Sequence, residues 1–181
     1  MRHLSLALPL CLFAALSHGA GAHDPAGHRH GSLPAHQHGS AELDAALDDK
    51  LLELELRSPA INLLGFEHRA RSQADLRTLA AARAQLEQPE ALFGLPVEAA
   101  CRLENANLQS PLFDDTQTEL AHSDIVARYR YTCAEPTALR EFALNGLFDA
   151  FPGIESLRVQ LIGPHGQQGA QANPARAQVR F

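Results

Sequence analysis

Apolar and polar residues alternate along two neighbouring stretches of the chain. Residues 40–47, SAELDAAL, carry alanine or leucine at every second position, and residues 51–58, LLELELRS, repeat this pattern with leucine. A period of two predicts a β-strand with one buried and one exposed face. Because only the polar residues 48–50, DDK, separate the two stretches, they predict a β-hairpin.

The second half of the chain repeats this strand pattern. Residues 99–108, AACRLENANL, predict one strand, and residues 122–136, HSDIVARYRYTCAEP, predict another. Alternate positions of the latter form one face: Ile125, Ala127, Tyr129, Tyr131 and Cys133. After Pro136 the pattern predicts a strand, a short aromatic turn or helix, a further strand, a Gly-rich hairpin and a closing strand.

One long helix is predicted over residues 72–89, SQADLRTLAAARAQLEQP. Ser72 is a good N-cap, Asp75 stands three residues on as in a capping box, and Pro89 stops the helix. Helical spacing, at intervals of three and four residues, predicts an apolar stripe along it: Leu76, Leu79, Arg83 and Leu86.

An irregular segment is predicted between the hairpin and this helix. In residues 58–68, SPAINLLGFEH, Pro59 ends the strand and Gly65 permits a sharp turn.

The predicted strands outnumber the predicted helices and mostly connect to their sequence neighbours. The pattern therefore predicts an α+β fold, mainly an antiparallel β-sheet with one main helix packed on it.

The N-terminal region predicts export. Residues 1–22 combine a basic start, an apolar run and small residues, which is typical of a signal peptide cleaved after Ala22. We expect residues 23–35 to form a flexible His-rich leader and residues 36–181 to form a single domain. Because no later stretch is apolar enough to span a membrane, we expect an exported protein without membrane insertion after cleavage.

Charge and motif content argue against several function classes. The chain carries 15 Lys and Arg against 21 Asp and Glu, a net charge of −6. This balance argues against nucleic acid and anionic membrane surfaces as partners and mildly favours cations. The chain contains no G-x-S-x-G, no H-E-x-x-H and no Gly-rich phosphate loop. We therefore expect a protein that is not an enzyme.

Two cysteines, Cys101 and Cys133, remain once Cys11 leaves with the signal peptide. In an oxidising exported compartment such a pair is most simply a disulfide. The alternative is a pair of thiolate metal ligands, which requires protection from oxidation.

Half of the ten histidines lie close together before or at the start of the first predicted strand: His23, His28, His30, His36 and His38. Neutral imidazole is a good ligand for zinc, copper and nickel. The two H-x-H pairs among them place both rings on one face of an extended chain. We predict low-affinity metal binding by the first three histidines, with an inert, solvated leader as the alternative.

Three further histidines lie in the body of the chain. His68 follows Glu67 in GFEH, and His122 opens a predicted strand with Asp124 two residues on, a possible partner for an imidazole N–H. His165 lies in the Gly-rich hairpin, where we expect it to be exposed. Each alone fits a structural or surface histidine. A four-ligand site requires four histidines to converge: His36, His38, His68 and His122.

Five segments follow one another along the chain: AHQHGSAELDAAL, LELRSPAINLLGFEH, LFGLPVEAAC, HSDIVARYRYTC and LFDAFPGIESLRVQLIGPHGQ. In sequence and order they resemble the ZrgA-type family of bacterial periplasmic zinc-binding proteins. The resemblance covers nearly the whole chain from about His36. The most specific parts of the resemblance lie in two segments. In the second segment they are SPA, N and GFEH (residues 58–60, 62 and 65–68). In the last segment they are F, FPG, E, L and VQ (residues 148, 151–153, 155, 157 and 159–160).

This resemblance implies zinc as the bound metal and a supporting role beside a high-affinity zinc ABC importer. It points to the same four histidines as ligands: His36, His38, His68 and His122. Some family members carry a long His- and Asp-rich insertion where this chain has only residues 109–121, QSPLFDDTQTELA. The zinc-collecting capacity of that insertion is therefore not carried over.

The residues alone leave two alternatives open. Imidazole-rich sites take copper and nickel as readily as zinc. A secreted, disulfide-stapled protein-interaction module with an incidental His-rich leader would show the same strands and cysteines. Zinc found in protein purified without a chelating resin would favour a zinc-binding protein over the interaction module.

Overall fold

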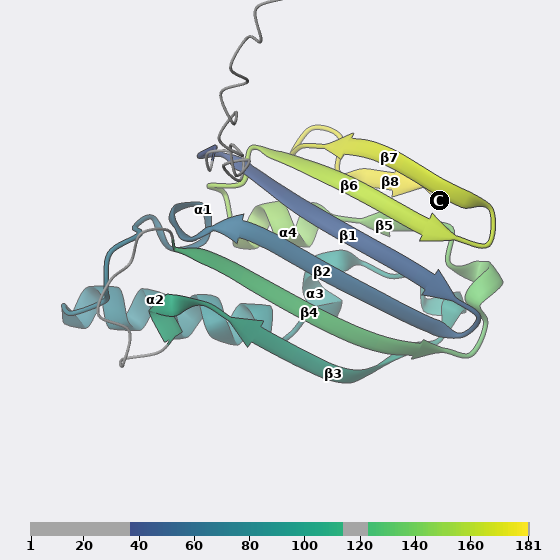
Figure 1. The fold of residues 1–181 in the computed structure, drawn as a ribbon, viewed down its shortest axis with the longest axis horizontal. Helices are drawn as coiled ribbons and strands as arrows, with labels where there is room; N and C mark the ends of the chain where they lie inside the picture. The colour runs from purple at the N-terminus through teal and green to yellow at the C-terminus, as the bar shows by residue number, and fades with distance from the viewer. Residues whose placement is uncertain (1–36, 114–122, 181) are drawn as a thin grey trace, which may run out of the picture. The chain divides into compact units, whose positions relative to one another are not determined.

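The computed structural model describes residues 37–113 and 123–180. A six-stranded sheet has the strand order β3-β4-β2-β1-β6-β7, and a small sheet pairs β5 with β8 (Figure 1). The strands are β1 Ser40–Asp48, β2 Leu51–Pro59, β3 Cys101–Gln109, β4 Asp124–Cys133, β5 Glu141–Ala143, β6 Ser156–Gly163, β7 Gly166–Ala172 and β8 Gln178–Arg180. The helices are α1 Ala60–Leu64, α2 Gln73–Leu86, α3 Glu90–Phe93 and α4 Asn145–Ala150, with short 3-10 turns at Val97–Ala99, Pro111–Phe113 and Pro136–Ala138.

The predicted hairpin is confirmed by β1 and β2. They pair antiparallel with Leu43 opposite Leu56 and Ala45 opposite Leu54, and all four side chains are buried. The intervening residues on both strands are mostly acidic and face outward, because successive side chains of a strand point to opposite faces. The hairpin thus supplies the middle of the sheet and much of its apolar face.

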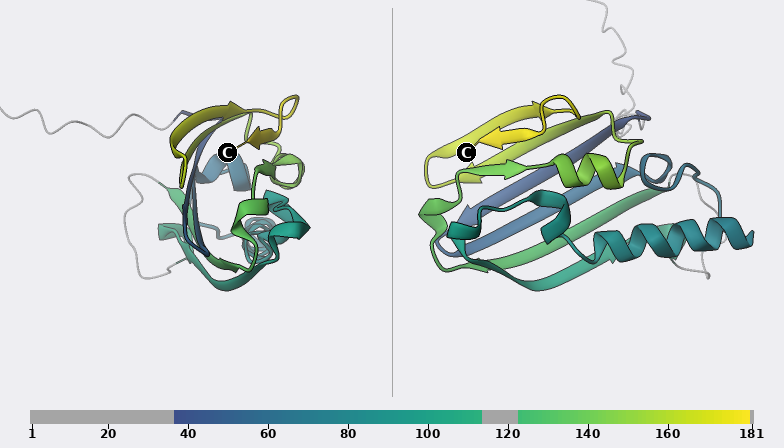
Figure 2. Two further views of the ribbon diagram at one scale, coloured as in Figure 1. Left: turned by 90° about the vertical axis from the view of Figure 1, so that its right-hand side faces the viewer. Right: turned by 180° about the vertical axis from the view of Figure 1, so that it is seen from behind.

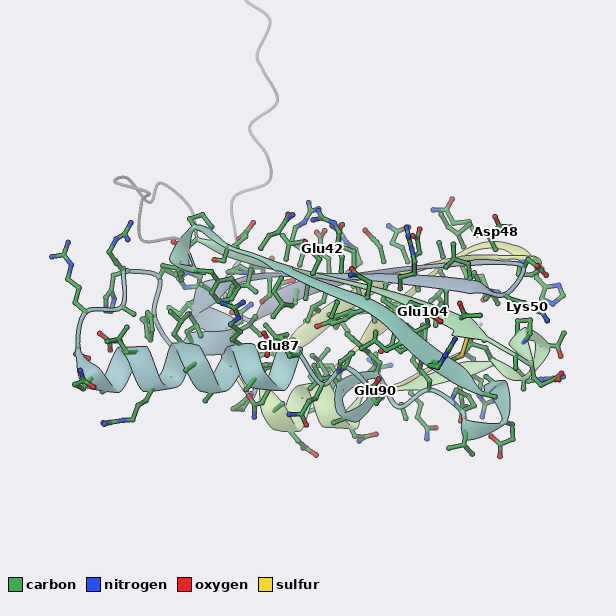
Figure 3. The ribbon with its side chains drawn as sticks, turned by 90° about the horizontal axis from the view of Figure 1, so that it is seen from below. Glu42, Asp48, Lys50, Glu87, Glu90 and Glu104 are labelled. Carbon is green, nitrogen blue, oxygen red and sulfur yellow. A yellow bond between two sulfur atoms is a disulfide. The ribbon has the colours of Figure 1, made fainter. Side chains whose placement is uncertain are left out.

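The helices and the small sheet lie against one face of the six-stranded sheet (Figure 2). Seen from the β3 edge, Glu42 and Asp48 lie on the side away from the helices, while Glu87 and Glu90 lie on the helix side (Figure 3). The core is formed between these layers by buried leucine, phenylalanine and alanine side chains. Among the described residues no helix is long and apolar enough to cross a membrane.

The sheet is mainly antiparallel, as predicted. Within the described strands one pair departs from this pattern: β1 and β6 run parallel, with Leu43 opposite Val159. Parallel neighbours need a long crossover, and here most of the described chain separates the two strands. The hairpin is therefore flanked by β4 on one side and by β6 on the other.

The predicted disulfide is confirmed. Cys101 and Cys133 lie directly opposite each other in β3 and β4, and their Sγ atoms are 2.07 Å apart. The two sulfurs are bonded to each other, so they are not thiolate metal ligands.

The long helix α2 begins as predicted but packs differently. Ser72 Oγ accepts from the N–H of Asp75 at 3.0 Å, and the Asp75 carboxylate accepts from the N–H of Ser72 at 3.3 Å, which completes the capping box. The predicted apolar stripe is confirmed only in part: Leu86 is buried and Leu79 packs partly buried against the core, whereas Leu76 is 43% exposed. The reason is that α2 extends past the end of the strands, so only its last turns reach the core (Figure 1).

The expectation of irregular chain over residues 58–68 is also wrong in part, because Ala60–Leu64 forms the short helix α1. Pro59 precedes its first turn, and Gly65 ends it in the left-handed region at a φ of 78°. The loop that contains His68 follows this short helix and lies at the end of the sheet where β4 starts.

Candidate metal site

Three strand ends meet at one end of the sheet. Pro59 at the end of β2 lies opposite Asp124 at the start of β4, and the start of β1 lies beside the end of β2 (Figure 1). His38 lies just before β1, and Ser123 just before β4. The segments that carry the predicted ligands therefore reach the same end of the sheet.

Asn62 of α1 holds the start of β1 in place. Its Oδ1 accepts from the N–H of Gly39 at 2.8 Å, and its Nδ2 donates to the carbonyl of Ser40 at 2.9 Å and to Ser58 Oγ at 3.1 Å. The side chain is buried, and Gly39 adopts a φ of 80°, which glycine reaches without strain. The backbone next to His38 is thus fixed to α1.

Ser123 joins the start of β4 to the same region. Its carbonyl accepts from the N–H of Ala60 at 2.7 Å, and its Oγ donates to the carbonyl of Glu67 at 2.9 Å. Ser123 is buried. The residue that follows position 122 is therefore anchored to the segment that carries Glu67 and His68.

The first ring at this end of the sheet is that of His38. Its Nε2 lies 3.7 Å from Glu67 Oε2, and the two side chains are 61% and 38% exposed. This contact brings together residues from the β1 and α1 segments. Both groups are open to solvent, so an ion can reach them.

The second ring is that of His68. It packs on Phe66 with a centroid distance of 4.8 Å, and its Nε2 lies 3.5 Å from Asp75 Oδ2. Hydrogen bonding to Ser72 and, more weakly, to the imidazole holds the pKa of Asp75 below its ordinary value. Asp75 is therefore a carboxylate that both caps α2 and faces the ring of His68.

The structure brings the predicted segments together but tests only part of the predicted ligand set. His38 and His68 are described, whereas His36, His122 and the leader histidines His23, His28 and His30 lie outside the described residues. Within residues 37–113 and 123–180 no group of three or more His, Cys, Asp or Glu side chains is placed to hold a metal ion. Convergence of the four histidines stays a prediction.

Sequence reasoning assigned no role to the two residues that organise this end of the sheet, although Asn62 is the N position among the specific pieces of the family resemblance. Asn62 and Ser123 act through contacts with residues far away in the chain, for which no local signal exists. Asp124, the expected partner of His122, lies at the start of β4 opposite Pro59. His165 is exposed in the turn between β6 and β7, as expected.

A hollow of about 810 Å³ lies on the outer face of the sheet, away from these histidines. Glutamates of β2 and arginines of β4 pair across it, with Arg128 Nε at 2.6 Å from Glu55 and Arg130 at 2.8 Å from Glu53. Burial, then the charges of Glu42 and Glu55, raise the pKa of Asp44. No histidine or cysteine of the described chain lines the hollow, so it is not a site for a metal held by imidazoles.

The family comparison covers the described domain. A family model described as "ZrgA family zinc uptake protein" matches residues 35–181. The comparison with curated proteins finds no match. The matched span starts just before His38 and includes every strand and helix described above.

Proposed function

The chain belongs to the ZrgA family of zinc uptake proteins, and from this premise we propose that it is a periplasmic zinc-binding protein rather than an enzyme. In this proposal it gathers or buffers zinc and supports uptake by a high-affinity ABC importer. The observation that carries it is the meeting of His38 with the Glu67–His68 segment at the end of the sheet where Ser123 leads into β4.

We propose that the ordered site takes its ligands from four histidines: His36, His38, His68 and His122. Imidazole nitrogen and carboxylate oxygen are donors that zinc takes in proteins. The backbone contacts of Asn62 and Ser123 support this assignment, because they hold the residues next to positions 38 and 122 against the His68 loop.

Zinc is cargo in this proposal, so the site must also release it. The rings of His38 and His68 are 61% and 65% exposed, which suits exchange with a partner better than permanent burial of a structural ion does. Weak collection by His23, His28 and His30 in the leader would raise the local supply. Copper and nickel remain competing cargoes, because imidazole binds them as well.

Zinc titration of the metal-free exported chain, with a chelator as competitor, tests this function. We expect one tight site that His68→Ala with His122→Ala removes, while His165→Ala, an exposed histidine at the β6–β7 turn, leaves it intact. Deletion of residues 23–34 should remove only weak binding. Tight binding that survives the double substitution would refute the ligand assignment.

The alternative function is a protein-interaction module, and the polar hollow on the outer face favours it. Paired arginines and glutamates with an additional Asp44 would suit a polar partner surface. Metal analysis of protein purified without an affinity tag or chelating resin separates the two functions. Absence of zinc, together with no thermal shift on adding zinc, would favour the module.

A further inference from the structure

Glu67 connects the segments that carry the predicted ligands. Its backbone carbonyl accepts from Ser123 Oγ at 2.9 Å, so the start of β4 is bound to it. Its carboxylate reaches toward His38 in front of β1, and its chain neighbour is His68. The side chain of Glu67 therefore extends from a fixed backbone into the space between these segments.

The distance between Glu67 and His38 fits two ligands of one ion better than it fits a hydrogen bond. Oε2 and Nε2 are 3.7 Å apart, whereas an N–H···O bond has a donor–acceptor distance of about 2.7–3.2 Å. With zinc–nitrogen and zinc–oxygen bonds of about 2.0–2.2 Å and a tetrahedral angle, two ligand atoms lie roughly 3.4 Å apart. A shift of a few tenths of an ångström in these exposed side chains brings both atoms to that spacing.

Asp75, the carboxylate that faces the ring of His68, has a different task. Asp75 already accepts from the N–H of Ser72 and caps α2, so its position is set by the helix. Among the described residues the carboxylate of Glu67 makes no hydrogen bond of this kind, and its ion pair is with His38. The carboxylate of Glu67 is thus not fixed by a helix cap and faces a candidate ligand ring.

We propose that Glu67 contributes a carboxylate oxygen to the zinc ion beside His38, so that a tetrahedral site holds this carboxylate together with three of the four proposed histidines. This inference rests on the proposed function. The carboxylate supplies a negative charge that neutral imidazoles do not, and an oxygen ligand makes the site less suited to soft copper(I) than imidazoles alone. Glu67 is then a zinc ligand that the histidine pattern did not indicate.

Glu67→Gln in the full exported chain tests the inference, with Glu135→Gln as matched control. Glu135 is exposed and lies beyond the opposite end of β4. The substitution keeps the carbonyl that Ser123 binds, so we expect the variant to fold, as checked by thermal unfolding. Zinc affinity should fall at least about 100-fold, more than loss of a residue that only orients a ligand. Bound cobalt(II), a spectroscopic substitute for zinc, should show a changed visible absorption.

Zinc affinity and the cobalt spectrum together decide the outcome. Weaker zinc binding with a changed cobalt spectrum in Glu67→Gln, and neither change in Glu135→Gln, supports the inference. Unchanged affinity, or weaker binding with an unchanged cobalt spectrum, overturns it while the proposed function stands as long as the His68→Ala and His122→Ala variant loses zinc. A parent chain that binds no zinc overturns the proposed function itself.

Discussion

A single buried amide organises the end of the sheet at which the candidate ligands lie. Asn62 satisfies one backbone N–H, one carbonyl and one hydroxyl from two other segments. Removing the Asn62 side chain would leave these groups without a partner. Each buried donor or acceptor that is left unpaired costs about 1–3 kcal/mol of stability. The amide therefore links the stability of the fold to the position of His38.

We expect Asn62→Ala to lower the free energy of unfolding by about 2–3 kcal/mol, measured by urea denaturation. The control is Ser58→Ala, which removes only one of the three Asn62 contacts and should cost about 1 kcal/mol. Equal losses in the two variants would show that the bonds to Gly39 and Ser40 contribute little.

Asp44 shows the opposite situation, a carboxylate that the fold disfavours. Partial burial of this otherwise exposed carboxyl raises its pKa, the charges of Glu42 and Glu55 raise it further, and those of Arg57 and Arg158 lower it by less. Because the folded-state pKa lies above the unfolded one, the ionised form destabilises the fold. Stability is therefore gained as the pH falls through the folded pKa toward the unfolded value of about 3.9.

Asp44→Asn should accordingly raise the free energy of unfolding at pH 7, by a few tenths to about 1 kcal/mol, since like charges directly across strands are destabilising by about that much. The gain should vanish near pH 3, where the parent carboxyl is protonated in both states. Denaturation at both pH values measures it. Asp149→Asn, an exposed position on α4, should show no such gain, and a gain that persists at low pH would contradict the argument.

At the scale of elements, α2 shows why position along a helix matters more than its pattern. Leu76 and Leu86 lie on the same predicted stripe, yet Leu76 is 43% exposed and Leu86 is fully buried. The carbonyl of Leu86 also accepts from the hydroxyl of Tyr129 at 2.8 Å, which joins the last turn of α2 to β4.

The two leucines therefore form a matched pair for substitution. We expect Leu86→Ala to lower the free energy of unfolding by about 2–5 kcal/mol through the cavity it leaves. Leu76→Ala should change it by no more than about 0.5 kcal/mol, as for an ordinary surface substitution. Thermal unfolding of both variants checks this, and similar losses would mean that the N-terminal half of α2 is packed after all.

The elements that could be predicted are those whose signals are local. The alternation in β1, β2 and β4 and the capping box of α2 each lie within a few residues, and all are present. The parallel pairing of β1 with β6 joins segments far apart in the chain, and no local pattern encodes it. The contact of Ser123 with Glu67 spans 56 residues for the same reason. Residue types could thus indicate metal binding by imidazoles, but not which carboxylate faces which ring.

At the scale of the whole described domain, β4 runs between the candidate metal site and the disulfide. Ser123, beside the candidate site, precedes β4, and Cys133 of the disulfide ends it. Ten strand residues at about 3.3 Å each place these features roughly 30 Å apart. The disulfide stabilises chiefly by restricting the unfolded chain, whereas a bound ion stabilises the folded state directly.

These two contributions should therefore be independent. Replacing both cysteines, Cys101→Ala with Cys133→Ala, should lower the free energy of unfolding by roughly 3–4 kcal/mol, given the 32-residue separation of the pair. At a temperature where both proteins are folded, the zinc Kd should be unchanged, because the described candidate ligands His38 and His68 lie at the opposite end of β4 from the bridge. Zinc at 100 times its Kd should then add the same increment, about 2.7 kcal/mol, to either protein. A tenfold loss of zinc affinity in the cysteine variant would instead mean that the bridge at one end of β4 helps to hold the strand ends that carry the ligands at the other.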